Sequence, residues 1–222
     1  MNLNDLHTLP GTRDYLEESW FSPGDILLAR SDSENREAFS DEIVRNFAEG
    51  KSSDPNDIPA FSGRKYDDYG GYGYCVKPES IFEIGVAAGY SIAGMIKGAG
   101  GSVKRVMLVD RSPDVYETVD KLNRVFPGVA VKFYCLDTQT PDVRQVHSYS
   151  YDIVHIDGNH TYEGALNDLN HFGIQVTQRG LIVVDDTKDP NIERACMEFA
   201  EQQNMDTRFI DNHNGHLLLM RR

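Results

Sequence analysis

Short apolar runs alternate with amphipathic stretches from residue 79 to the end of the chain. Apolar, β-rich runs of this kind predict buried strands, here at 80–85, 106–110, 129–136, 152–157 and 181–186. The stretches with helical spacing predict helices at 89–97, 112–126, 141–147 and 191–203. A further, crossover helix is expected between the strands 152–157 and 181–186. Two shorter strands, 207–210 and 216–220, flank an Asn-Gly pair that is typical of a hairpin turn. This alternation predicts an α/β fold, a doubly wound, mostly parallel, Rossmann-like seven-stranded sheet with a C-terminal antiparallel hairpin.

The first part of the chain does not follow this pattern. Residues 34–48 carry an apolar stripe at helical spacing, which predicts a helix packed on the main domain or on a partner subunit and favours a homo-oligomer. Residues 51–77 are polar and rich in Pro, Gly and Tyr, which predicts a surface loop or a lid over a ligand. We therefore divide the chain into an N-terminal extension, 1–77, and a main domain, 78–222.

Composition and charge exclude several classes of function. The net charge of −13 disfavours binding to nucleic acid, which needs a basic face. No apolar run is long enough to span a membrane, and the N-terminus shows no secretory signal. The three cysteines, Cys75, Cys135 and Cys196, are widely spaced and lack zinc-ligand spacing. They indicate free thiols in a reducing compartment, so we expect a cytoplasmic protein.

Three carboxylates follow two of the predicted strands directly. Asp157 ends one strand, and Asp185 and Asp186 end the next. Open α/β sheets bind ligands at the carboxyl ends of their strands, so these side chains should converge if the strands are neighbours. Like charges at one place repel one another, and a hard divalent cation is their natural counter-charge.

The first strand of the main domain runs into a glycine turn with the sequence Glu83-x-Gly85-x-x-x-Gly89. A dinucleotide fingerprint would have a further glycine where Ala87 stands, so a pyrophosphate ligand is disfavoured. Asp110 ends the second strand, where an acid can accept hydrogen bonds from both ribose hydroxyls. It can instead serve as a cap of the following turn. By itself a glycine turn is also explained by the geometry of a tight strand-to-helix connection.

These residues together resemble a known family. The glycine turn with Tyr90 and Ser91, Asp110, and the carboxylates at the strand ends are similar to those of class I S-adenosylmethionine-dependent methyltransferases. The resemblance is greater to metal-dependent O-methyltransferases of the catechol type. The stretches IDGNHTYEGALNDL and RGLIVVDD are most similar to enzymes that methylate sugars and other natural-product hydroxyls, such as the macrocin type. The resemblance covers residues 78–221.

The resemblance implies a role for each matching position. The cofactor would be S-adenosylmethionine, with Asp110 on its ribose and the loop after the third strand on its adenine. The residues implied in cofactor binding are Glu83, Gly85, Gly89, Tyr90, Ser91, Asp110, Asp137, Thr138 and Asp157, with Gln139 beside them. The metal, expected to be Mg²⁺ or another divalent cation, would be bound by Asp157, Asp185 and Asp186.

His160 lies where the family carries its general base. A histidine can take a proton near neutral pH, so we expect His160 to deprotonate the acceptor hydroxyl. It can alternatively orient Asp157 or the substrate. The expected acceptor is a small-molecule diol or catechol, because two adjacent oxygens would chelate a cation. His155, inside a buried strand, is expected to be a hydrogen-bonded core residue.

Other functions stay open at this point. A nicotinamide-dependent oxidoreductase would use the same fold, but the glycine spacing disfavours it. A non-catalytic, methyltransferase-like module would have no need for the charged cluster. A metal-independent methyltransferase would keep the cofactor and act on another acceptor.

Overall fold

The computed structural model describes residues 64–146, 149–211 and 214–222. The predicted helix at 34–48, the first part of the predicted loop, 51–63, and His213 lie outside this part. Within it, the predicted main domain and the end of the predicted extension can be compared with the structure.

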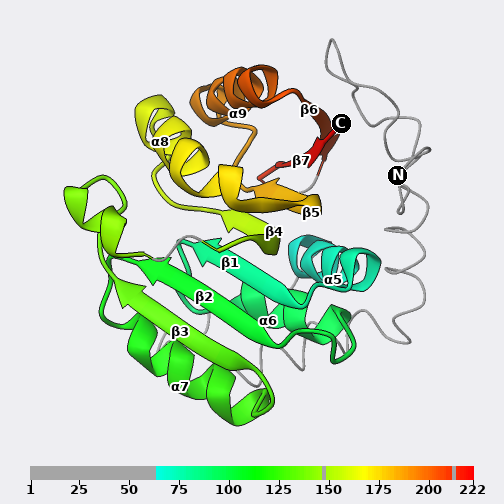
Figure 1. Cartoon of the computed structure of the whole chain (residues 1–222), viewed down its shortest axis with the longest axis vertical. Helices are drawn as coiled ribbons and strands as arrows, with labels where there is room; N and C mark the ends of the chain where they lie inside the picture. Colours follow the sequence, from blue (N-terminus) through cyan, green and yellow to red (C-terminus); the bar gives the residue numbers. More distant parts are fainter. Residues whose placement is uncertain (1–63, 147–148, 212–213) are drawn as a thin grey trace.

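A seven-stranded sheet forms the centre of the molecule (Figure 1). Its order is β3-β2-β1-β4-β5-β7-β6, and β7 runs antiparallel to both of its neighbours. The other pairs are parallel. The strands are β1 (Ser80–Ile84), β2 (Arg105–Asp110), β3 (Ala130–Cys135), β4 (Tyr151–Ile156), β5 (Val176–Val184), β6 (Met205–Ile210) and β7 (His216–Arg221). The predicted doubly wound sheet with its C-terminal antiparallel hairpin is confirmed.

Helices cover both faces of this sheet because alternate residues of each strand point to opposite sides. Ile81 packs with α5 (Arg64–Val76), α6 (Tyr90–Gly98) and α7 (Val115–Val125). Phe82 packs on the other side with α8 (Tyr162–Phe172) and α9 (Pro190–Gln203). Short 3₁₀ turns lie at η2 (Pro141–Gln145) and η3 (Gly173–Gln175). Two apolar cores result, one on each face.

The prediction of a loop up to residue 77 is wrong for its last part, which forms helix α5. Tyr69, Tyr72 and Val76 recur at helical spacing and are buried against α6. The glycines that suggested a loop instead allow the two helices to approach closely. A Cβ on Gly98 of α6 would lie 1.9 Å from the carbonyl oxygen of Gly70 in α5.

Other boundaries also differ from the predicted ones. Helix α7 begins at Val115 rather than Ser112, because Ser112 Oγ accepts a hydrogen bond from the backbone of Asp114 in a turn that precedes the helix. The short helix predicted after β3 is present as a 3₁₀ helix, η2, which ends at Gln145. Strand β5 begins at Val176, earlier than predicted. Polar residues interrupt the apolar pattern of its first part, but this part still pairs with β4.

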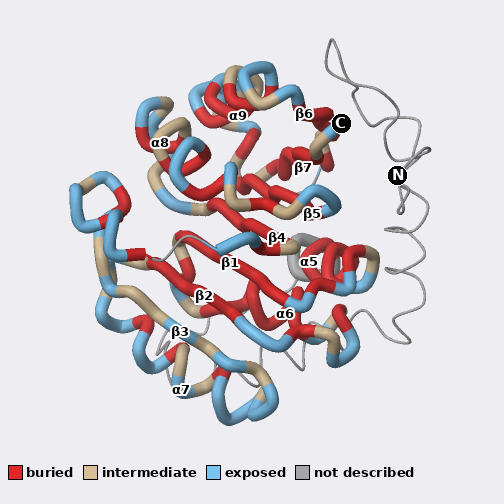
Figure 2. The backbone as a smooth tube through the Cα atoms, in the orientation of Figure 1, coloured by how far each residue is buried: buried red, intermediate tan, exposed pale blue. Residues whose placement is uncertain are grey.

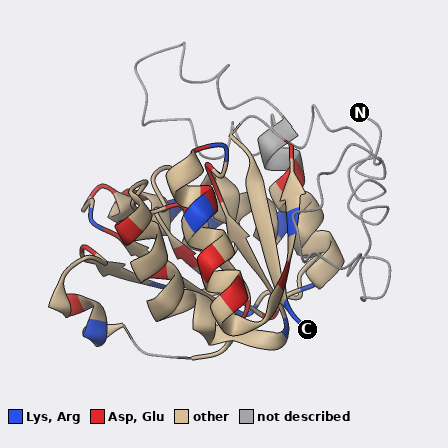
Figure 3. Cartoon of the chain, turned by 90° about the horizontal axis from the view of Figure 1, so that it is seen from above, with Lys and Arg blue, Asp and Glu red and all other residues tan. Residues whose placement is uncertain are grey.

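Burial is greatest along the middle strands and falls toward β3 and α7 (Figure 2). Acidic and basic residues are scattered over several elements, and the view in Figure 3 shows no continuous basic stripe in the described part. None of the described helices combines the length and the apolar character needed to cross a membrane.

Candidate active site

A pocket of about 550 Å³ lies at the carboxyl ends of β1, β2 and β4 and beside the loop after β3. This is the edge of the sheet at which open α/β folds bind ligands. Ile84, Val109 and Leu136 give the pocket an apolar side. Six of the residues singled out from the sequence line it, namely Gly85, Asp110, Asp137, Thr138, Asp157 and His160.

The glycine turn forms one wall of the pocket. Gly85 has a φ of 78°, and a Cβ there would lie 1.8 Å from the carbonyl oxygen of Asp157. The turn therefore needs glycine for its left-handed backbone and for its contact with the end of β4. Gly89 begins α6 with a φ of 77° and lies against Thr118 of α7. Tyr90 is buried in the core on the α6 side.

Asp110 holds this turn in place. Its Oδ2 accepts hydrogen bonds from the backbone N–H groups of Val86 and Ala87, at 2.8 and 3.1 Å. Its Oδ1 accepts one from the backbone of Ser112, at 2.8 Å. The carboxylate thus caps the turn that follows β2 and also ties β2 to the glycine turn. A carboxylate oxygen has about two acceptor sites, so Oδ2 is fully used and Oδ1 has room for one ligand hydroxyl.

One cluster of possible metal ligands lies at the rim of the pocket. Single ligand atoms of Asp157, His160 and Asp186 lie within 4.8 Å of one another. His160 Nε2 is 3.5 Å from Asp157 Oδ1 and 3.2 Å from Asp186 Oδ2. The hydrogen bond to Asp157 and the charge of Asp186 raise the pKa of His160 above its ordinary value. Asp186 has a φ of 57°, an uncommon conformation for a residue with a side chain.

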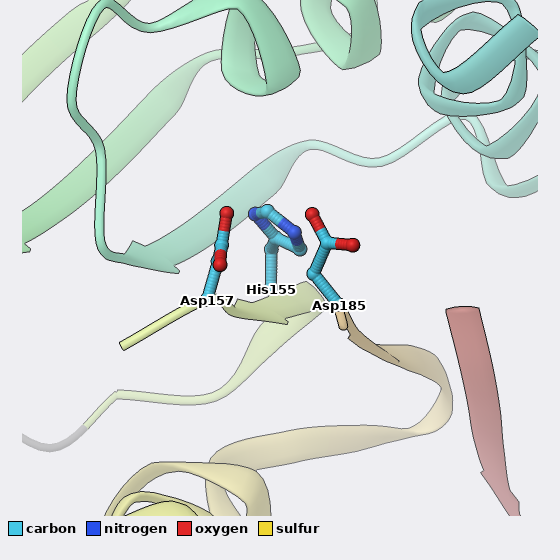
Figure 4. Close-up of side chains that lie close together, drawn as sticks. All are labelled: His155, Asp157 and Asp185. Carbon is cyan, nitrogen blue, oxygen red and sulfur yellow. The ribbon is translucent and has the colours of Figure 1, made fainter. Parts of the chain in front are cut away.

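A second cluster lies deeper and shares Asp157 with the first. Ligand atoms of His155, Asp157 and Asp185 lie within 4.8 Å of one another, with His155 between the two carboxylates (Figure 4). Period-2 alternation puts His155 of β4 and Glu83 of β1 side by side on the face that α5 and α6 cover. The structure therefore divides the predicted metal ligands between two groups, with Asp186 at the rim and Asp185 in the interior.

Buried hydrogen bonds connect the deeper cluster to α5. The Tyr69 hydroxyl donates to Asp185 Oδ2 at 2.9 Å and lies 3.2 Å from His155 Nε2. His155 Nδ1 is 2.8 Å from Glu83 Oε1, which also accepts a hydrogen bond from the Ser91 hydroxyl. Burial lowers the pKa of His155, but the hydrogen bond to Glu83 and its charge outweigh burial, and the net shift is upward. The expectation of a hydrogen-bonded core histidine agrees with this environment.

The comparisons with known proteins concern the middle of the chain and its fold. A family model described as a methyltransferase domain matches residues 82–187, which span the strands that build the pocket. This match identifies a methyltransferase domain in the middle of the chain. A search of curated proteins found no match.

Solved methyltransferases share the fold at low sequence identity. The S-adenosylhomocysteine-bound methyltransferase PaMTH1 of Podospora anserina gives a TM-score of 0.68 at 14% identity, over 88% of this chain and 93% of that chain. An O-methyltransferase of Bacillus cereus in complex with S-adenosylhomocysteine gives 0.59 at 14% identity, over 92% of this chain and 99% of that chain. At this identity the likeness is one of fold. The oxidoreductase alternative has no support from these comparisons.

The residues of this pocket fit an S-adenosylmethionine cofactor. The apolar side of the pocket can receive an adenine ring, and Asp110 and Asp137 are acceptors at the ends of β2 and β3. Glu83 is fully buried below the glycine turn, and no hydrogen bond to its Oε2 is found among the described residues. Glu83 is bonded to Ser91 and His155 inside the protein and does not line the pocket, so it supports the glycine turn rather than touching a ligand.

Several residues of this site were not found from the sequence. Tyr69 and Tyr72 were assigned to a loop, although their helical spacing was a usable signal. His216 of β7 has its Nδ1 2.8 Å from the Tyr72 hydroxyl and its Nε2 3.4 Å from Asp185 Oδ1. No local pattern points to that contact. Arg111 lines the pocket directly after Asp110 and was also overlooked.

Proposed function

We propose that this methyltransferase transfers the methyl group of S-adenosylmethionine to a hydroxyl of a small molecule, with the help of a divalent cation such as Mg²⁺. The expected acceptor is a sugar or another natural-product diol or catechol. The observation that carries the proposal is the position of His160 next to Asp157 and Asp186, at the rim of the pocket formed by the glycine turn and Asp110.

His160 is suited to remove the proton of the acceptor hydroxyl. Its imidazole is about half exposed and lines the pocket, so a substrate can reach the ring. The Nε2–H group lies next to Asp157 and Asp186, which orient the ring, leave Nδ1 to take the proton and stabilise the charge of the ring once it has done so. A general base held this way typically contributes about 10²–10⁴-fold to the rate. The base role of His160 supports an oxygen acceptor.

The donor set also fits a hard cation. Carboxylate oxygens of Asp157 and Asp186 would hold it, with Asp185 behind them, and its positive charge would favour the ionised form of the acceptor oxygen. Holding the acceptor and the cofactor at neighbouring places in one pocket supplies the orientation that a direct transfer needs. S-adenosylmethionine supplies the methyl group.

A second candidate is a metal-independent methyltransferase. The observation that favours it is the distance of His160 Nε2 to both carboxylates, 3.2 and 3.5 Å. A protonated His160 can balance part of their charge without a cation.

Calorimetry separates these two functions. The wild-type protein is titrated with S-adenosylhomocysteine after chelation, and then with Mg²⁺. We expect cofactor-product binding in both conditions and a separate Mg²⁺ signal that is lost in Asp186→Ala. Asp120→Ala, an exposed change on α7, serves as the control and should keep that signal. Product binding without any Mg²⁺ signal would favour the metal-independent enzyme, and no product binding would exclude both.

A further inference from the structure

The loop after β3 forms the end of the pocket that we assign to the adenine. Side chains of helix α8 form hydrogen bonds with this loop. Thr138 lines the pocket. Its backbone carbonyl accepts a hydrogen bond from Asn167 Nδ2 of α8, at 3.1 Å. Its hydroxyl oxygen accepts one from Gln139 Nε2, at 3.0 Å. The side chain and the backbone of Thr138 are therefore both fixed.

Asp168 is the next residue of α8 and anchors the same loop. It is fully buried, and its Oδ1 accepts a second hydrogen bond from Gln139 Nε2, at 3.0 Å. The two N–H groups of the Gln139 amide are thus shared between Thr138 and Asp168. Because both are used, the amide has one orientation, and the loop is tied to the helix at Asn167 and at Asp168.

Asp168 also contacts a second segment of the pocket, the loop after β4. A Cβ on Gly158, which lines the pocket, would lie 2.6 Å from Asp168 Oδ2. The carboxylate therefore touches the loop after β4 while it holds the loop after β3. A buried carboxylate is costly unless several donors compensate it, so its retention between two pocket loops needs an explanation.

We infer that Asp168 is a positioning residue for cofactor binding, which through Gln139 holds the loop after β3 in the shape that receives the nucleoside. It does not touch the cofactor itself, since it does not line the pocket. This inference rests on the proposed binding of S-adenosylmethionine in this pocket.

The test is a double-mutant cycle on the Kd for S-adenosylhomocysteine, measured by calorimetry with the full chain. Asp168→Ala and Gln139→Ala should each raise the Kd about tenfold, the usual effect of losing a hydrogen bond to a charged group. The double variant should be no worse than the more severe single one, because both changes break the hydrogen bond between Gln139 and Asp168. Asp168→Asn keeps the acceptor oxygen and should restore the Kd to within a few-fold of wild type.

Asn170→Ala, an exposed change on the same helix, is the control and should leave the Kd unchanged. Additive effects of the two alanine variants, or an unchanged Kd in both, would overturn the inference while wild-type binding still supports the function. If the wild-type protein does not bind S-adenosylhomocysteine, the proposed function fails first. If Asp168→Ala does not fold, the other two variants decide. The inference requires that Gln139→Ala weakens binding of S-adenosylhomocysteine and that Asp168→Asn keeps it.

Discussion

At the scale of single residues, burial sets the charge state of Asp168. Burial raises the pKa of this carboxyl from 3.8 to about 6, while hydrogen bonds from Thr138, from the backbone of Asn159 and from Gln139, together with the charge of His171, oppose the rise. The folded protein therefore binds the Asp168 proton more tightly than the unfolded chain does. The stabilisation that protonated Asp168 gives is present at low pH and is lost as the pH rises from about 4 to about 6.

Asp168→Asn should remove this pH dependence. Between pH 4 and pH 7 the free energy of unfolding of the variant, relative to wild type, should rise by up to about 3 kcal/mol, since one pKa unit corresponds to about 1.4 kcal/mol. Urea unfolding at several pH values measures the difference. A constant difference across this range would show that Asp168 has an ordinary pKa in the folded protein.

The other functional side chains differ in how firmly they are held. Asp110 receives three backbone N–H groups and is part of the frame of the pocket. His160 is more exposed, and its ring lies near two carboxylates at 3.2 and 3.5 Å, so it can change its position when a ligand binds. This division suits an enzyme in which the cofactor end of the site is built in advance and the acceptor end adapts.

At the scale of elements, the contact between α5 and α6 links the N-terminal part of the described chain to the site. The two helices approach at glycines, and α5 then places Tyr69 on Asp185. Helix packing without side chains at the contact lets backbones come close. The position of Asp185 therefore depends on a helix that precedes the matched methyltransferase region.

Gly98→Ala should disturb this contact. The added methyl group would lie 1.9 Å from the carbonyl oxygen of Gly70, so α5 must move. We expect a loss of about 1–3 kcal/mol in the free energy of unfolding, although alanine by itself favours a helix. Gly128→Ala is the matched control, because a Cβ there meets no atom within 4 Å. Equal stability of both variants in urea would show that α5 is not packed as described.

At the scale of the whole molecule, the pocket joins segments from most of the sheet. Ligand binding at such a place should stabilise the folded state as a unit, because the ligand binds only the folded protein. S-adenosylhomocysteine at about 100 times its Kd should add about 2.7 kcal/mol to the free energy of unfolding. Thermal unfolding measures this as a higher Tm that depends on the ligand concentration.

A chelator should leave most of that shift in place, because Asp110 and Asp137 are assigned to the cofactor product alone and only Asp157 is also assigned to the cation. Mg²⁺ added after chelation should raise the Tm further in the wild type but not in Asp186→Ala. A shift by S-adenosylhomocysteine that disappears on chelation would mean that the two ligands share one site.

The sequence alone determined the elements of the main domain and which residues end its strands. Alternation of apolar runs is a local property, so it predicted the strands and the doubly wound sheet. For the same reason it placed Asp110, Asp157 and the pair Asp185 and Asp186 at strand ends. It failed at 64–76, where glycines that pack two helices were interpreted as loop residues.

Only the tertiary structure decided which of these groups meet. The strand order puts Glu83 beside His155, and the packing of α5 brings Tyr69 to Asp185. Asp185 therefore lies inside, while Asp186 lies next to His160, which lines the pocket. The support of the β3 loop by Asp168 joins residues from two different elements. Such contacts depend on how the layers of the fold pack. Local periodicity does not reveal them, because the two residues in contact lie far apart in the sequence.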